Sequence, residues 1–141
     1  EKSSGSSSSK AGNGSATGQA VVNYALQFEG NRYVYGGSWN GELPYNPTDC
    51  SGFVQGVFRH FGISLPRTTS SQLVASNVRR ISLSEVRAGD ICMFQGHVAL
   101  FTGNGYEIIH AANPRLGLIV TKDYRYSTNT FITALRVNGV N

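Results

Sequence analysis

The chain has 141 residues, with 12 lysines and arginines against 8 acidic residues and a formal net charge of +4. This length suffices for one domain with a hydrophobic core, and no apolar run approaches the length of a membrane span. The charge excess suits a polyanionic partner such as nucleic acid, anionic lipid or an acidic wall polymer. However, the basic residues are scattered and are not interleaved with aromatic residues, which argues against direct nucleic-acid binding.

Residues 1–18 are mostly serine and glycine and contain no hydrophobic residue larger than alanine. Such a segment cannot bury enough apolar surface to offset the entropy lost on ordering. We therefore predict a flexible linker or tail over residues 1–18 and a folded domain over residues 19–141. Because the chain begins with Glu1 rather than methionine, we expect a piece of a larger multidomain protein, with another domain preceding the linker.

The first half of the folded region carries helical patterns, in which apolar residues recur at a spacing of three to four. Gly30 and Gly62 end the first two of these runs, and Thr68 or Thr69 is suited to cap the third. A loop rich in glycine and aromatic residues separates the first two helices. The predicted helices span residues 19–29, 50–61 and about 69–75.

The second half of the folded region has the character of strands. Short apolar runs alternate with turns, and the turn Gly103-Asn104-Gly105 is a strong signal for a hairpin. Helices followed by an antiparallel meander predict an α+β domain. The predicted strands span residues 90–94, 97–102, 106–111, 118–121 and 131–137.

The segment Asp49-Cys50-Ser51-Gly52 places a cysteine at the start of the second predicted helix. The partial positive charge of a helix N-terminus favours thiolate over thiol, so Cys50 is a candidate nucleophile. A buried structural cysteine is the alternative, because free cysteines are among the most buried residues. Position alone does not separate these two interpretations.

Two histidines favour the catalytic interpretation. His97 opens one predicted strand and His110 closes the next, so the hairpin brings them together. In that position His97 is suited to accept the proton of Cys50, and His110 to hydrogen-bond the other ring nitrogen of His97 and fix its tautomer. His60 lies nearly three turns past Cys50 on the same helix, too far to reach it, and we expect it to be solvated.

Two structural alternatives involve the second cysteine, Cys92. A disulfide between Cys50 and Cys92 is disfavoured because a strand around Cys92 buries that residue without a partner. A zinc site made of both cysteines with His97 and His110 lacks the paired short spacings of structural zinc sites. We therefore predict no bound metal and no cofactor, and interpret Cys92 as a core residue.

In order and spacing, several segments resemble the NlpC family of papain-like bacterial cell-wall cysteine peptidases. The resemblance covers about residues 19–137 and implies the papain-like NlpC fold, with N-terminal helices packed on a central antiparallel sheet of about five strands. It departs from the family pattern at Tyr35, where tryptophan is usual. The segments that carry it are Arg32-Tyr33-Val34-Tyr35-Gly36-Gly37, Asp49 to Gln55, Leu65-Pro66-Arg67-Thr68, Gly89-Asp90-Ile91, Gly96-His97-Val98 and Ile109-His110-Ala111.

The resemblance implies a peptidoglycan hydrolase that cleaves stem peptides between γ-D-glutamate and the diamino acid at position three, which is lysine or diaminopimelate. Cys50 is then the nucleophile that forms an acyl-enzyme, His97 the base and later the acid, and His110 the group that orients His97. Peptidoglycan stem peptides are the implied partner, together with anionic wall polymers. The implied location is outside the cell, secreted or wall-associated, as a monomer.

The resemblance also implies three substrate-binding residues. Tyr33 would lie over the nucleophile and help to hold the oxyanion. Asp49 and Ser51 would contact the free amine of the first alanine of the stem, although helix capping is the structural alternative for both. A related wall amidase or cross-bridge peptidase is the alternative activity, and a non-catalytic wall-binding module is the alternative of another class.

Overall fold

The structure is a computed structural model that describes residues 14–141. Residues 1–13 of the predicted linker lie outside the described residues. The last part of that segment is joined to the folded domain, since the amide of Gly14 donates to the carbonyl of Gly62 at 3.0 Å and the amide of Ala16 donates to that of Gly139 at 2.9 Å. Gly18 is buried. The ordered domain therefore includes residues 14–18, which the prediction assigned to the linker.

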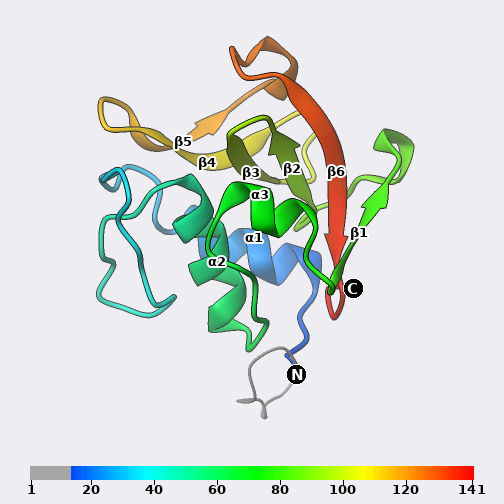
Figure 1. Cartoon of the computed structure of the whole chain (residues 1–141), viewed down its shortest axis with the longest axis horizontal. Coiled ribbons are helices and arrows are strands. Elements are labelled where there is room, and N and C mark those ends of the chain that lie inside the picture. The colour runs from blue at the N-terminus through cyan, green and yellow to red at the C-terminus, as the bar shows by residue number, and fades with distance from the viewer. Residues whose placement is uncertain (1–13) are drawn as a thin grey trace.

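The predicted α+β class is confirmed (Figure 1). All three predicted helices and all five predicted strands form, with ends that differ by a few residues. Two short 3-10 helices, Leu83–Glu85 and Tyr124–Tyr126, lie in the connections. The helices and strands are α1 (Gly18–Leu26), α2 (Cys50–His60), α3 (Thr69–Leu73), β1 (Val78–Ile81), β2 (Ile91–Phe94), β3 (His97–Phe101), β4 (Ile108–Asn113), β5 (Gly117–Thr121) and β6 (Phe131–Val137).

The strands form one antiparallel sheet in the order β1-β6-β2-β3-β4-β5. β1 is the strand that the prediction lacks. Its sequence is Val-Arg-Arg-Ile, which has no alternation of apolar and polar residues, and only its pairing with β6, from Val78 with Val137 to Ile81 with Ala134, defines it. Such a strand depends on tertiary contacts and has no local signal.

The helices cover one face of the sheet, with α2 lying against β3 and β4 (Figure 1). One side of α2 buries Phe53, Val54, Val57 and Phe58 completely. Full burial of a side chain of this size contributes about 1.5–3 kcal/mol, so this face fixes α2 firmly on the sheet. Among the described residues, no helix is long and apolar enough to cross a membrane.

A second, smaller cluster of apolar side chains lies on the opposite face of the sheet. Alternation along β2 sends Ile91 and Met93 into the helix-facing core and Cys92 and Phe94 into this second cluster. Cys92 is fully buried there and burial raises the pKa of its thiol. Both cysteines are free, so no disulfide joins Cys92 to Cys50.

The Gly89-Asp90 turn before β2 is held by a buried ion pair. Both carboxylate oxygens of Asp90 accept hydrogen bonds from the guanidinium of Arg136, at 2.9 and 2.8 Å, and one also accepts from the amide of Arg87 at 2.9 Å. Asp90 is fully buried. The turn is thereby tied to β6 at the start of β2, where Ile91 pairs with Leu100 near the end of β3.

Candidate active site

Cys50 is the first residue of α2 and is almost buried, with 8% of its surface exposed. Asp49 caps the helix, since its side chain accepts a hydrogen bond from the amide of Gly52 at 2.9 Å. The sulfur accepts a hydrogen bond from the backbone N–H of Val98 and lies 3.9 Å from the hydroxyl of Thr69. The thiol is therefore held between the helix layer and the start of β3.

Burial is the largest influence on the Cys50 thiol, and it raises the pKa. The hydrogen bonds from Val98 and Thr69 act in the opposite direction, because they stabilise the thiolate. The helix N-terminus was expected to favour the thiolate on its own. In the folded chain desolvation outweighs these effects, so the thiol needs a nearby base to become a nucleophile.

His97 and His110 meet as the hairpin predicted. Nε2 of His97 lies 2.7 Å from Nδ1 of His110, and Nε2 of His110 lies 2.8 Å from the hydroxyl oxygen of Thr121. Two proton arrangements satisfy this chain when both imidazoles are neutral: His97 donates to His110 and His110 to Thr121, or the hydroxyl of Thr121 donates to His110 and His110 to His97. The first arrangement leaves Nδ1 of His97 unprotonated, with its lone pair available to accept a proton.

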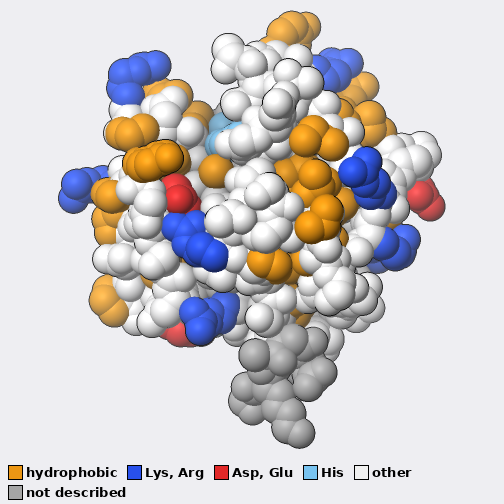
Figure 2. Space-filling view, in the orientation of Figure 1, with side chains coloured by type: hydrophobic (Ala, Val, Ile, Leu, Met, Phe, Trp, Pro, Cys, Tyr) orange, Lys and Arg blue, Asp and Glu red, His pale blue; other side chains and the backbone are white. Residues whose placement is uncertain are grey.

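The two imidazoles are neutral at physiological pH. Burial lowers the pKa of His97 to about 4, and burial together with the charge of His97 lowers that of His110 to about 3. His97 neighbours Val98, whose amide contacts the Cys50 sulfur. The site is therefore a neutral thiol beside a neutral base, an arrangement that forms a nucleophile by transfer of a proton within the site. Figure 2 shows histidine atoms in a hollow of this face, beside a group of hydrophobic side chains.

Tyr33 is half-buried and lies near Cys50, the candidate nucleophile. It forms an isolated β-bridge with Thr48, two residues before Cys50. Burial raises the pKa of Tyr33, and the negative charges that Cys50 and Asp49 carry when ionised raise it further. The phenol therefore keeps its proton at neutral pH and is a hydrogen-bond donor, as an oxyanion contact requires.

Asp49 is engaged by a residue to which the sequence alone assigned no role. The guanidinium of Arg67 contacts one carboxylate oxygen of Asp49 at 2.9 Å and the other at 3.0 Å. Arg67 also donates to the hydroxyl of Ser51 at 2.9 Å and to the carbonyl of Gly37 at 2.6 Å. The negative charge of Asp49 is therefore compensated in the free protein, and Asp49 has the capping role that was the structural alternative.

The structure brings the six predicted site residues to one region: Tyr33, Asp49, Cys50, Ser51, His97 and His110. Sequence reasoning missed the roles of Arg67, Thr69 and Thr121. Arg67 belongs to the Leu-Pro-Arg-Thr segment that carries the family resemblance, which is a usable signal. Thr121 has no local signal, because only the register between β4 and β5 places it beside His110.

His60 lies outside the site, as predicted, but it is not freely solvated. Its Nδ1 is 2.9 Å from a carboxylate oxygen of Glu42, and its ring stacks on Tyr24 at 3.6 Å between centroids. Within residues 14–141, no group of three or more histidine, cysteine or acidic side chains is arranged to hold a metal ion. His60 thus anchors the loop that carries Glu42, and it has no contact with Cys50.

The chain belongs to the NlpC/P60 family, because the sequence model of that family matches residues 30–136. This span contains all six predicted site residues. Over 95 residues the chain is 41% identical to the bifunctional muramidase/DL-endopeptidase CwlT of Bacillus subtilis (strain 168), covering 62% of this chain and 27% of that protein. Over 123 residues it is 32% identical to the murein DD-endopeptidase MepS/murein LD-carboxypeptidase of Escherichia coli (strain K12), covering 83% of this chain and 61% of that protein.

A solved structure agrees with the sequence comparison. The NlpC/p60 domain of the peptidoglycan hydrolase SagA superposes with a TM-score of 0.67 at 29% identity, covering 86% of this chain and 100% of that domain. The papain-like NlpC fold expected from the sequence is therefore confirmed. The chain spans less than two thirds of the length of either CwlT or MepS.

Proposed function

We propose that this chain is a cysteine endopeptidase that hydrolyses the stem peptides of peptidoglycan, at the bond between γ-D-glutamate and the diamino acid at position three. The observation that carries the proposal is the neutral base on the His97–His110–Thr121 chain beside the buried thiol of Cys50. Relatives named as a DL-endopeptidase and a murein endopeptidase support the substrate class.

The acylation step begins with transfer of the thiol proton to His97. Cys50 passes its proton to Nδ1 of His97, and the sulfur attacks the carbonyl carbon of the scissile bond. The backbone amide at the start of α2 and the phenol of Tyr33 are suited to donate to the oxyanion that forms. The carbon–nitrogen bond then breaks, and His97 gives its proton to the departing amine, which leaves a thioester on Cys50.

Deacylation reverses the roles of the same groups. His97 takes a proton from water, the hydroxide attacks the thioester carbon, and the sulfur leaves as the thiolate and recovers a proton from His97. His110 holds the ring of His97 in one orientation during both steps. A neutral partner is sufficient for this, because the thiol is far more acidic than a serine hydroxyl.

The experiment is a digest of purified peptidoglycan, with the Cys50→Ala variant as the blank and mass spectrometry of the released fragments. We expect muropeptides that end in L-alanyl-D-glutamate, with the dipeptide still amide-linked to the lactyl group, to appear only with the wild-type protein. Release of whole stem peptides from the lactyl group would instead identify the alternative activity of a wall amidase. Cleavage of the cross-bridges would identify the alternative cross-bridge peptidase. A wild-type digest indistinguishable from the blank would support a non-catalytic wall-binding module and overturn the proposal.

The proposed substrate also defines the proposed location. Peptidoglycan lies outside the cytoplasmic membrane, so we propose that the protein is secreted or wall-associated. Fractionation of the producing cells, with an antibody against this chain, tests this directly. Recovery of the protein only from the cytosol would contradict it.

A further inference from the structure

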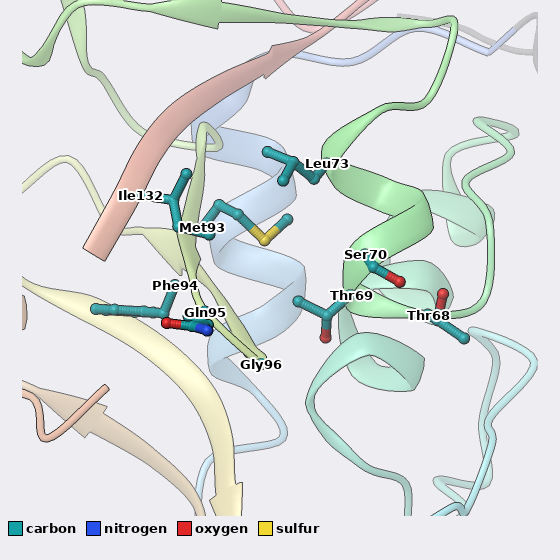
Figure 3. Close-up of a pocket in the computed structure, with 9 residues that line it drawn as sticks. All are labelled: Thr68, Thr69, Ser70, Leu73, Met93, Phe94, Gln95, Gly96 and Ile132. Carbon is teal, nitrogen blue, oxygen red and sulfur yellow. The ribbon is translucent and has the colours of Figure 1, made fainter. Parts of the chain in front are cut away.

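A groove of about 380 Å³ lies between α3 and the sheet (Figure 3). One wall is α3, which contributes Thr69 and Leu73, and the other is formed by β2, the β2–β3 turn and β6. Leu73, Met93 and Ile132 gather at one end of the groove, as Figure 3 shows. This volume lies within the range of pockets that bind small ligands or short peptide segments.

Two contacts make the groove continuous with the catalytic groups. Thr69 lines it, and the hydroxyl of Thr69 lies 3.9 Å from the sulfur of Cys50. Gly96 lines it from the other wall and immediately precedes His97. A peptide whose scissile bond lies at Cys50 therefore has a direct path into the groove.

The chemistry of the reaction indicates which part of the substrate follows this path. The group that protonates the departing amine must touch its nitrogen, so the leaving part of the peptide passes on the side of His97. The turn that immediately precedes His97 contributes Gln95 and Gly96 to the wall of the groove. The leaving segment is thus the part of the substrate that meets this groove. Its first residue, the diamino acid, lies at the scissile bond beside Thr69 and Gly96. The residue after it is therefore the one that reaches the end near Leu73 and Ile132.

None of the nine residues that line the groove carries a charge. A charged side chain of the substrate placed here would lose water without gaining an ionic partner, which is costly. Small apolar side chains instead gain contact with Leu73 and Ile132, next to the fully buried Met93. The lining therefore favours a small, uncharged side chain of the substrate.

We propose that this groove binds the leaving segment of the substrate and selects a small, uncharged residue after the position-three diamino acid. This inference rests on the proposed function and adds a specificity to it. Ile132, with 39% of its surface exposed, and Gln95, which is exposed in the β2–β3 turn, are accessible places at which to alter that specificity.

The test uses synthetic peptides of the form L-Ala–γ-D-Glu–diamino acid–X, amidated at the C-terminus, with X as D-Ala, D-Glu or D-Lys. Both a lysine and a diaminopimelate series are made. For the wild-type protein we expect kcat/KM to be at least about tenfold higher for D-Ala than for either charged residue. Equal values for the three peptides would overturn the proposal.

Variants that add a positive charge to the groove provide the matched comparison. Ile132→Lys and Gln95→Lys each add a cation to the groove, and we expect each to raise the ratio of kcat/KM for D-Glu over D-Lys by about tenfold. Leu83→Lys makes a similar change at an exposed leucine outside the groove and should leave this ratio unchanged. A ratio that is unchanged in both groove variants, with circular dichroism like that of the wild type, would overturn the proposal.

The experiments distinguish an error in the proposed groove specificity from an error in the proposed function. If the wild-type protein cleaves no peptide in either series, the proposed function is wrong, and the groove is then tested by binding alone. Met93 is the only methionine in the chain, so selective labelling gives one methyl signal that reports on the groove. A shift of that signal when the D-Ala peptide is added to Cys50→Ala supports the groove, and an unchanged signal overturns it.

Discussion

Nε2 of His97 lies 2.7 Å from Nδ1 of His110, and this contact leaves Nδ1 as the ring nitrogen of His97 outside the hydrogen-bond chain. His110 also reaches the hydroxyl of Thr121 at 2.8 Å, so both of its ring nitrogens are engaged. When His97 donates to His110, Nδ1 of His97 is the acceptor for the proton of Cys50. We propose that the chain holds His97 in this tautomer during the reaction.

Thr121 is a positioning residue, because it acts on His97 only through His110. Thr121→Val removes the hydrogen-bond partner of Nε2 of His110, and we expect kcat to fall about tenfold with KM little changed. Thr121→Ser keeps the hydroxyl and should keep kcat near that of the wild type. Steady-state kinetics on a stem peptide measure both values, and equal losses in the two variants would contradict the role of the hydroxyl.

Burial of the two histidines makes stability depend on pH in a defined direction. Their pKa values, about 4 for His97 and about 3 for His110, lie below the unfolded value near 6.5, so the unfolded chain binds more protons between these limits. The free energy of unfolding should fall as pH drops from 6.5 towards 4, by at most about 1.4 kcal/mol per pH unit for each histidine.

Urea unfolding at pH 5.0, 5.75 and 6.5 measures this slope. The double variant His97→Gln/His110→Gln removes both titrating groups and should have a much shallower slope over the same range. This range avoids most of the carboxylate titration, which lies lower. Equal slopes for the wild type and the double variant would show that the histidines are not buried in the neutral form.

The buried pair of Asp90 and Arg136 holds the turn before β2. Asp90→Asn leaves the guanidinium of Arg136, which has 12% of its side chain exposed, without its anion, and we expect a loss of about 3–5 kcal/mol in the free energy of unfolding. Asp123→Asn breaks a solvent-exposed pair with Arg125 and should have little effect. Chemical denaturation of both variants measures these two losses. Similar losses of unfolding free energy in the two variants would contradict the prediction.

The ion pair of Asp49 and Arg67 should tune the reactivity of Cys50. The charge of Asp49 raises the pKa of the Cys50 thiol, and Arg67 compensates that charge. Arg67→Gln should therefore slow alkylation of Cys50 by iodoacetamide several-fold at pH 7.5, and the double variant Asp49→Asn/Arg67→Gln should restore much of the rate. Cys92 is fully buried and contributes little to the measured rate. An alkylation rate that is the same in all three proteins would exclude this coupling.

Most of the fold and the central part of the candidate site could be predicted from the sequence, for physical reasons. The apolar spacing after Cys50 defines α2 locally, and the Gly-Asn-Gly turn defines the hairpin that joins His97 to His110. β1 was missed because Val-Arg-Arg-Ile has no alternation. The participation of residues 14–18 was missed because it rests on backbone hydrogen bonds to distant residues, which composition does not reveal.

The raised pKa of Cys50 also lay beyond the sequence. Position at a helix N-terminus is readable from the pattern, but the desolvation that outweighs it depends on packing against β3. Likewise, the bond from Arg67 to Asp49 joins residues 18 apart in the chain through their tertiary arrangement. The candidate nucleophile and base were therefore predictable, whereas the groups that tune them were not.

The most direct test of the central claim compares the wild-type protein with Cys50→Ala and Cys50→Ser in the release of L-alanyl-D-glutamate from a stem peptide. All three proteins are first shown by circular dichroism to share one fold. We predict a loss in kcat/KM of at least about a thousandfold for Cys50→Ala, and a large loss for Cys50→Ser, because serine is a much weaker acid than cysteine. Release by Cys50→Ala within tenfold of the wild-type rate would contradict the account.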